Sequence, residues 1–187
     1  MEPRTLTDGR VTLSPPRPAD IDTITEACRD AAIAEWTTVP APYERADAVR
    51  FVGDIVPAKW ERGFPDWAIR TSDHGPLCGM VGFVARGDTE PEIGYWVAPD
   101  ARQQGLATAA VRLACDFAFS SEGMGVWRIA WRAFVGNVSS ASVARHAGFR
   151  FEGVARHGLL QRGTPRDAWV AGLLPDDPRT PGDAWPI

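Results

Sequence analysis

Apolar residues recur along the chain with two different periods, and together these periods predict a mixed α/β fold. A spacing of three and four residues predicts amphipathic helices over residues 20–34, 45–62, 105–120 and 139–146. Shorter apolar or alternating runs predict strands over residues 10–13, 67–71, 77–86, 92–97, 127–135, 149–154 and 168–174. The expected order is a strand, two helices, three strands, a helix, a strand, a helix and two strands.

The connections between these elements predict a mixed sheet within one domain. Tight turns, such as residues 73–76, join the early strands, so we expect these strands to be antiparallel. The helix over 105–120 separates two strands that should be parallel, because a helical crossover brings the chain back in the same direction. We expect a single domain over residues 1–174, followed by a poorly ordered Pro- and Asp-rich tail over 175–187.

Composition excludes several classes of function. The 187 residues are 44% hydrophobic and 24% charged, which is typical of a globular chain. A net charge of -4 and a pI of about 5.4 argue against a nucleic-acid partner and are compatible with a cationic amine substrate. The beginning of the chain, MEPRTLTDGR, does not resemble a secretory signal, and no apolar run is long enough to span a membrane, so we expect a cytoplasmic protein. The cysteines and histidines have no metal-ligand spacing, so we expect no metal.

The stretch from Glu92 to Thr108 carries the strongest chemical signal. A predicted strand runs into a turn and then into a helix N-terminus, where Gly105 and Ala107 allow the backbone to approach a ligand closely. Unpaired N–H groups at such a helix start favour a phosphate or pyrophosphate. The sequence matches neither a Walker P-loop nor the dinucleotide fingerprint. By itself the turn would also suit tight packing between helix and strand.

Further motifs surround this turn in a fixed order: Trp36–Tyr43, Phe64–Ile69, Leu77–Gly82, Glu92–Val97, Arg102–Ala107, Asn137–Ser140, Ala147–Phe149, Glu152–Gly153 and Arg166–Asp167. In this order and spacing they resemble the GNAT acetyltransferase superfamily, in particular its RimJ/RimL-like branch, which contains ribosomal-protein Nα-acetyltransferases. The resemblance covers about residues 10–174. It implies a GNAT fold, with a mixed central sheet, a splayed parallel strand pair and about four flanking helices.

The resemblance also implies acyl-CoA as the donor, acetyl-CoA first. The backbone groups that would bind the pantetheine arm belong to Trp96, Val97 and Ala98. Those that would hold the pyrophosphate, together with the Arg102 side chain, belong to Gln103, Gln104, Gly105, Leu106, Ala107 and Thr108. The Gly-Lys pair common in the family is replaced here by two glutamines, so the backbone should carry more of the phosphate binding. Asn137 would bind the pantetheine amides, place the following helix as its N-cap, or do both.

Few side chains are needed to transfer an acyl group from a thioester to an amine. Glu92 is the candidate general base, because strand alternation puts it on one face with Gly94 and Trp96; it would otherwise order loops or bind the substrate cation. The family's usual tyrosine acid is replaced by Ala144, which leaves Ser140 as the candidate acid or as a helix-capping hydroxyl. Tyr95 should face the opposite side of the strand and belong to the core.

These residues predict an N-acyltransferase that acts on a primary amine. A peptide or protein N-terminus is the first acceptor class, followed closely by small-molecule amines such as aminoglycosides or polyamines. Trp36, on an expected loop, is the candidate for the acceptor pocket. A CoA-binding sensor without turnover, a succinyl-CoA donor and a homodimer stay open.

Overall fold

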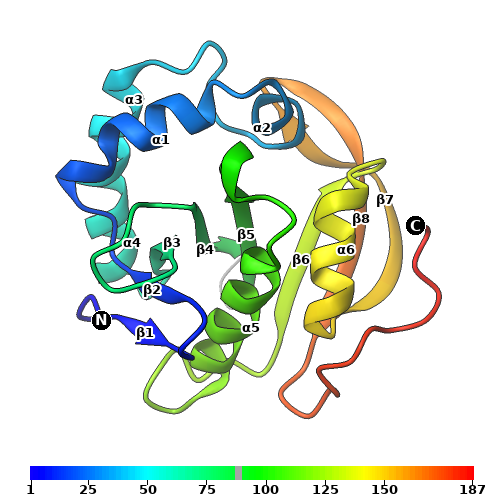
Figure 1. Cartoon of the computed structure of the whole chain (residues 1–187). Coiled ribbons are helices and arrows are strands. Elements are labelled where there is room, and N and C mark those ends of the chain that lie inside the picture. The colour runs from blue at the N-terminus through cyan, green and yellow to red at the C-terminus, as the bar shows by residue number, and fades with distance from the viewer. Residues whose placement is uncertain (87–89) are drawn as a thin grey trace.

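A mixed eight-stranded sheet, with strand order β1-β2-β3-β4-β5-β6-β8-β7, organises the computed structural model, which describes residues 1–86 and 90–187 (Figure 1). The strands are β1 (Leu6–Thr7), β2 (Thr12–Ser14), β3 (Asp66–Arg70), β4 (Gly79–Arg86), β5 (Glu90–Val97), β6 (Ile129–Phe134), β7 (Arg150–Gln161) and β8 (Thr164–Leu173). The helices are α1 (Ile21–Cys28), α2 (Ala31–Trp36), α3 (Arg45–Arg50), α4 (Val56–Glu61), α5 (Leu106–Phe119) and α6 (Val138–Ala147). A short π-helical stretch, Phe51–Ile55, joins α3 to α4.

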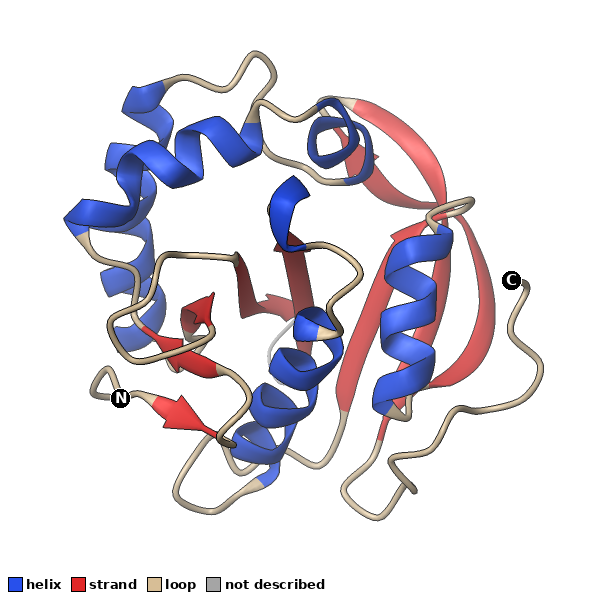
Figure 2. Ribbon diagram, viewed as in Figure 1, coloured by secondary structure: helices blue, strands red, loops and turns tan. Residues whose placement is uncertain are grey.

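The parallel pair expected around the helix at Gly105 is confirmed as β5 and β6. The two strands are paired only at Glu92 with Ala130 and at Ile93 with Trp131, although both continue further. Beyond Ile93 they diverge, toward the top of the view in Figure 2. Strand β5 remains paired with β4 as far as Val97, and β6 remains paired with β8 as far as Phe134. The sheet therefore opens into a V with β5 and β6 as its arms.

Helices cover both faces of the sheet. Helix α5 packs against β3, β4 and β5, and α6 packs against β6, so one face buries a large aromatic and aliphatic cluster that includes Trp67, Phe83 and Trp131. On the other face, α1 and α3 bury Ile24 and Ala48 against Met80 and its neighbours. We call these the α5 face and the α1 face.

The first helix is not continuous, contrary to the sequence pattern. Asp30 has an extended ψ of 131° and accepts a hydrogen bond from the Ile33 N–H, so it ends α1 and N-caps α2. Trp36, which was expected on a loop, is instead the last residue of α2. The apolar period does not reveal this break, because Ile33 of α2 is buried as Ile24 and Cys28 of α1 are.

Two other expectations about the C-terminal part are wrong. Strands β7 and β8 form one long hairpin, where the sequence pattern predicts strands only over 149–154 and 168–174. The tail after residue 174 is not loose, because Trp185 is 9% exposed and its ring packs edge-to-face against that of Trp131, with the ring centres 5.4 Å apart. The Arg145 Nε also donates to the Gly182 carbonyl, which holds the tail against α6.

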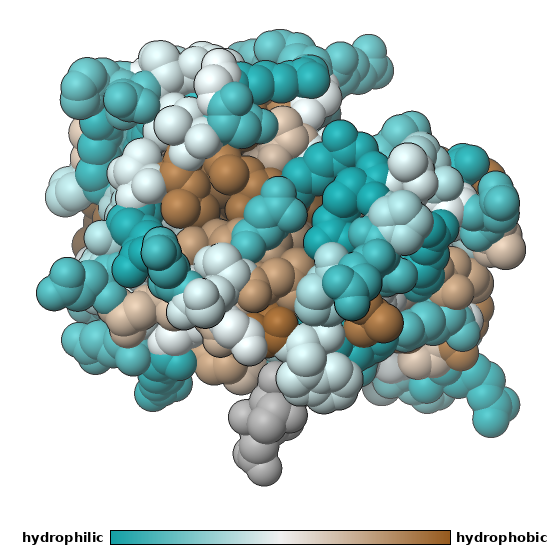
Figure 3. All heavy atoms as spheres, turned by 90° about the horizontal axis from the view of Figure 1, so that it is seen from below, coloured by the Kyte–Doolittle hydropathy of each residue, from teal (hydrophilic) through white to brown (hydrophobic). Residues whose placement is uncertain are grey.

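Within the described residues, no helix is both long and apolar enough to cross a membrane. The underside of the molecule shows apolar side chains interspersed with hydrophilic ones (Figure 3).

Candidate functional site

The V places an open strand edge beside a helix N-terminus. The Ala98 N–H donates to the Cys78 carbonyl at 2.9 Å and is therefore committed to β4. Backbone groups alternate in direction along a strand, so those of Val97 point to the open edge, where the Val97 carbonyl accepts from the Arg102 Nε at 3.4 Å. Of the three residues predicted for the pantetheine arm, Trp96 to Ala98, Val97 is thus the one that faces into the V.

Helix α5 begins where that edge ends. Its N-cap, Gly105, adopts a left-handed φ of 72°, and Gln103 also has a positive φ of 61°. These two residues turn the chain sharply between β5 and the helix. The first-turn N–H groups, those of Leu106, Ala107 and Thr108, have no carbonyl partner inside the helix and carry its positive dipole end.

Basic side chains that the sequence analysis did not single out lie beside this turn. A pocket of about 360 Å³ is lined by Asp8, Arg10, Gly105, Thr108, Ala109, Arg112 and His146. The Arg10 Nη2 donates to the Gln104 carbonyl at 2.8 Å, which holds the loop between β1 and β2 against the turn before α5. Arg10 is far from this motif in sequence, so no local signal could have identified it. Arg112 lies four residues after Thr108 on the same face of α5, and that helical spacing could have identified it.

Two of the three polar side chains of the Arg-Gln-Gln turn, those of Arg102 and Gln104, are bound within the protein. Arg102 forms an ion pair with Asp30, the N-cap of α2, and Gln104 Nε2 donates to the Asp100 carbonyl at 3.2 Å. The Arg102 guanidinium holds the pKa of the Asp30 carboxyl below its usual range. This ion pair links the turn before α5 to the helix that carries Trp36.

Glu92 lies at the base of the V on the α1 face. The residue is 9% exposed, and its Oε2 is 3.6 Å from the Arg132 Nε on the neighbouring arm. The strand register places Gly94 and Trp96 on the same face as Glu92, as the alternation predicts. The carboxylate therefore faces the side of the sheet from which an acceptor can approach without crossing α5 or α6.

Ser140 lies on the α5 face, within a cluster of hydrogen-bonding groups. Its Oγ is 3.2 Å from the Tyr95 hydroxyl, and the Trp131 Nε1 donates to both oxygens, at 3.0 Å to Tyr95 and 3.3 Å to Ser140. Tyr95 in turn donates to the Ser140 carbonyl at 2.8 Å. Asn137 is the N-cap of α6, because its Oδ1 accepts from the Ser140 N–H at 3.1 Å.

Tyr95 makes contacts that the sequence analysis did not predict. It packs against the core, as expected, but its hydroxyl comes from β5 and meets a helix 45 residues further along the chain. Burial raises the pKa of Tyr95 far above its usual value, so the phenol stays protonated at neutral pH. Glu92 and Tyr95, three residues apart on β5, thus point to opposite faces of the sheet, and Ser140 of α6 lies on the face of Tyr95.

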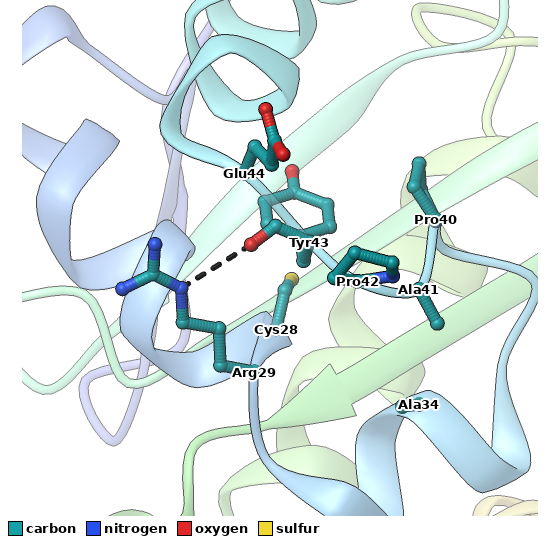
Figure 4. A pocket seen from close by; sticks show the side chains of 8 residues that line it. All are labelled: Cys28, Arg29, Ala34, Pro40, Ala41, Pro42, Tyr43 and Glu44. Atoms are coloured by element: carbon teal, nitrogen blue, oxygen red, sulfur yellow. Dashed lines mark hydrogen bonds between the residues drawn. The ribbon is translucent and has the colours of Figure 1, made fainter.

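A second pocket, of about 400 Å³, opens between the end of α1, α2 and the loop before α3. Figure 4 shows Cys28 lying beneath the Tyr43 ring, with Pro40 and Pro42 at the side of the pocket. The Arg29 Nε donates to the Tyr43 carbonyl at 3.2 Å and holds the loop against α1. Burial raises the pKa of the Cys28 thiol to about 12.

The described residues contain no group of three His, Cys, Asp or Glu side chains arranged to hold a metal ion.

Known proteins resemble the chain in both sequence and fold. A relative named "Putative ribosomal N-acetyltransferase YdaF", from Bacillus subtilis (strain 168), is 35% identical over an alignment of 122 residues that covers 59% of this chain and 66% of that relative. The chain thus matches slightly less than two thirds of that relative's length. Mycobacterium smegmatis RimJ, solved in complex with CoA-disulfide, superposes with a TM-score of 0.79 at 23% identity, covering 93% of this chain and 88% of that one.

A RimL structure, described as a ribosomal L7/L12 alpha-N-protein acetyltransferase in complex with coenzyme A, superposes equally well. Its TM-score is 0.79 at 15% identity, and the superposition covers 91% of this chain and 98% of that one. At this identity the likeness shows the shared fold. The family described as "Acetyltransferase (GNAT) domain" matches residues 10–150, from the strand before α1 to the start of β7. The chain belongs to this family of GNAT acetyltransferases.

Proposed function

We propose that this chain transfers an acetyl group from acetyl-CoA to a primary amine. The observation that carries the proposal is the V, in which the open edge of β5 leads to the first turn of α5. Side chains that can exchange protons lie on both faces beside it: Glu92 on the α1 face, and Tyr95 with Ser140 on the α5 face. An acyl thioester held along that edge would be accessible to an amine from the α1 face. Membership of the GNAT family and the acetyltransferase names of its relatives support this chemistry.

The residues of the V fit the parts of coenzyme A. The Val97 N–H on the open edge suits a pantetheine carbonyl, as an added strand would, and the Val97 carbonyl would suit a pantetheine amide once it is released from the Arg102 Nε. The first-turn N–H groups of α5 suit the pyrophosphate. Arg10 and Arg112, which line the adjoining pocket, supply positive charge that the two glutamines of the turn do not. Asn137 would contribute to CoA binding indirectly, by holding the start of α6 in place, because its side-chain oxygen caps that helix.

Two protein groups would move the protons. Glu92 would accept a proton from the ammonium form of the acceptor, directly or through water, so that the free amine attacks the thioester carbonyl. As the C–N bond forms and the C–S bond breaks, Tyr95 or Ser140 would donate a proton to the departing sulfur. Burial raises the pKa of Tyr95, which keeps the phenol protonated at neutral pH and also makes it a weaker acid toward the thiolate. Proximity in the V would supply much of the rate.

An amine panel tests the proposal. Peptides with free N-termini, polyamines and aminoglycosides are each incubated with acetyl-CoA or succinyl-CoA, and thiol release is followed. Release of the CoA thiol in the presence of an amine and acetyl-CoA supports the proposal. Faster release from succinyl-CoA would show that succinyl-CoA is the preferred donor. Tight binding of acetyl-CoA by calorimetry with no transfer to any amine would indicate a CoA sensor. Failure to bind CoA would contradict both functions.

The remaining sequence-based expectations stay predictions. They are a cytoplasmic location, a homodimer, and the extent of the acyltransferase domain, residues 1–174. A role for Trp36 in acceptor binding is also part of the proposal. Its ring lies on the α1 side of the V mouth, close to the Arg166 guanidinium.

A further inference from the structure

A second guanidinium lies on the acceptor side of the V, further out than Glu92. Strand β8 pairs Ala168 with Phe134, so Arg166, two residues before Ala168, shares the face of Phe134. The same alternation along β6 puts Phe134 on the face of Arg132, the residue that approaches Glu92. Glu92, Arg132 and Arg166 therefore follow one another along one face, from the base of the V to its mouth.

Arg166 is held rigidly in this position. Its guanidinium carbon lies 4.5 Å from the centre of the Phe134 ring and 5.7 Å from that of the Trp36 ring. Its Nη1 donates to the Gln161 Oε1 at 2.7 Å. The Gln161 Nε2 in turn donates to the Glu35 and Thr37 carbonyls, at 2.7 and 2.9 Å. A guanidinium fixed in this way loses little conformational freedom when it binds a ligand.

The charge of Arg166 is not neutralised by the described residues. No described carboxylate forms an ion pair with it, and among the described residues only Gln161 accepts a hydrogen bond from its guanidinium, which carries five N–H groups. The Asp167 carboxylate accepts instead from the His157 N–H at 2.9 Å, away from the guanidinium. Among the side chains that the structure describes, Arg132 and Arg166 are cations that share this face with Glu92.

We propose that Arg166 selects acceptors that carry a carboxylate a few residues from the reacting amine, which deepens the proposed function and rests on it. Glu92 lies level with Ala130, four residues before Phe134, so the two ends of the face are about 13 Å apart at ~3.3 Å per residue. The backbone of an extended peptide covers that span in about four residues, and fewer suffice where side chains reach toward one another from both ends. Glu92 binds the α-ammonium, and Arg166 binds an Asp or Glu side chain at positions two to four.

This arrangement disfavours polycationic acceptors. A polyamine or an aminoglycoside would bring further positive charge to a face that already holds two guanidiniums and one carboxylate. The acceptor class is therefore a peptide or protein N-terminus with an acidic residue close behind it.

Matched peptides test the inference. Four hexapeptides differ only at position three, which is Glu, Gln, Lys or Ala, and spermidine serves as the polycation. Wild type should acetylate the Glu peptide about 10- to 100-fold better in kcat/KM than the Gln peptide, the size of one charge-assisted hydrogen bond. Moving the Glu along the peptide should give a maximum between positions two and four. The preference should weaken as ionic strength rises.

Variants separate recognition from structure. Arg166→Gln should reduce the Glu-to-Gln ratio to about one and leave the rate on the Gln peptide within roughly threefold of wild type, and Arg166→Lys should restore part of the ratio. Arg162→Gln is the matched control. Arg162 lies at the tip of the same hairpin and donates to the Val39 and Ala34 carbonyls, but it does not contact the Phe134 ring. This control should keep the full preference.

Three results would overturn the inference. A wild-type enzyme that acetylates all four peptides equally, or that prefers the Lys peptide or spermidine, shows no anion recognition while the proposed function stands. An Arg166→Gln enzyme that is slower on every peptide by the same factor, with its ratio kept, shows that Arg166 only clamps α2. An enzyme that releases no CoA with any amine removes the proposed function, and the inference falls with it.

Discussion

Replacing Gly105 by alanine tests the predicted pyrophosphate site most directly, because two separate strains act on this residue. Its φ of 72° costs an L-residue about 1–2 kcal/mol. A Cβ there would also lie 2.5 Å from the Arg10 Nη2. Since that atom ends a flexible side chain, Arg10 should swing away and give up its hydrogen bond to the Gln104 carbonyl, at a further cost of about 0.5–1.5 kcal/mol.

The combined cost is about 1.5–3.5 kcal/mol, which corresponds to a fall in Tm of about 3–14 °C for a chain of this size. If the first-turn N–H groups of α5 hold the pyrophosphate, the distorted turn loses about one charge-assisted hydrogen bond. The Kd for acetyl-CoA, measured by calorimetry, should then rise about 10- to 100-fold.

Gly125→Ala is the matched control. Gly125 has a φ of 60°, and a Cβ there would meet nothing within 4 Å. It lies beyond the far end of α5, about 20 Å from Gly105 at 1.5 Å per residue. The control should lose stability through backbone strain alone and keep its affinity for acetyl-CoA. If Gly105→Ala has the lower Tm and yet binds acetyl-CoA as wild type does, the pyrophosphate lies elsewhere and the reasoning fails.

Three further predictions concern the base, the core and a thiol. Glu92→Gln should lower kcat by about 10²–10⁴-fold with acetyl-CoA affinity unchanged, whereas near-normal kcat with an unaltered pH profile would exclude a base role. Asp20→Asn should cost about 3–5 kcal/mol by calorimetry, because Asp20 and the fully buried Arg70 form a bidentate pair at 2.6 and 3.0 Å. The exposed Asp22→Asn should change stability by less than ~1 kcal/mol, and equal losses would contradict the argument. Because burial raises the pKa of Cys28 to about 12, iodoacetamide at pH 8 should alkylate it far more slowly in the folded chain than in guanidinium; equal rates by mass spectrometry would refute this.

Most of the elements, and the part of the site built from a single segment, were predictable from the sequence, although the break before α2 and the length of the β7–β8 hairpin were not. The period of apolar residues identified the helix after Gly105 and the strands on either side of it, since burial of one face requires that period. The rule for helical crossovers then made those strands parallel, and the structure confirms the pair. The turn that starts α5 was also recognisable, because glycine conformation and helix N–H groups depend on neighbours in the chain.

Tertiary structure alone decided which distant side chains meet. Tyr95 reaches Ser140 across 45 residues, and Gln161 reaches the end of α2 across more than 120. The break before α2 coincides with a contact of the same kind, since the Asp30 carboxylate both caps the helix and pairs with Arg102. Such contacts depend on how the elements pack, and packing places groups within hydrogen-bonding distance irrespective of their separation in sequence. The periodicity of one strand shows which face a side chain takes, and only the packed fold shows what that side chain touches.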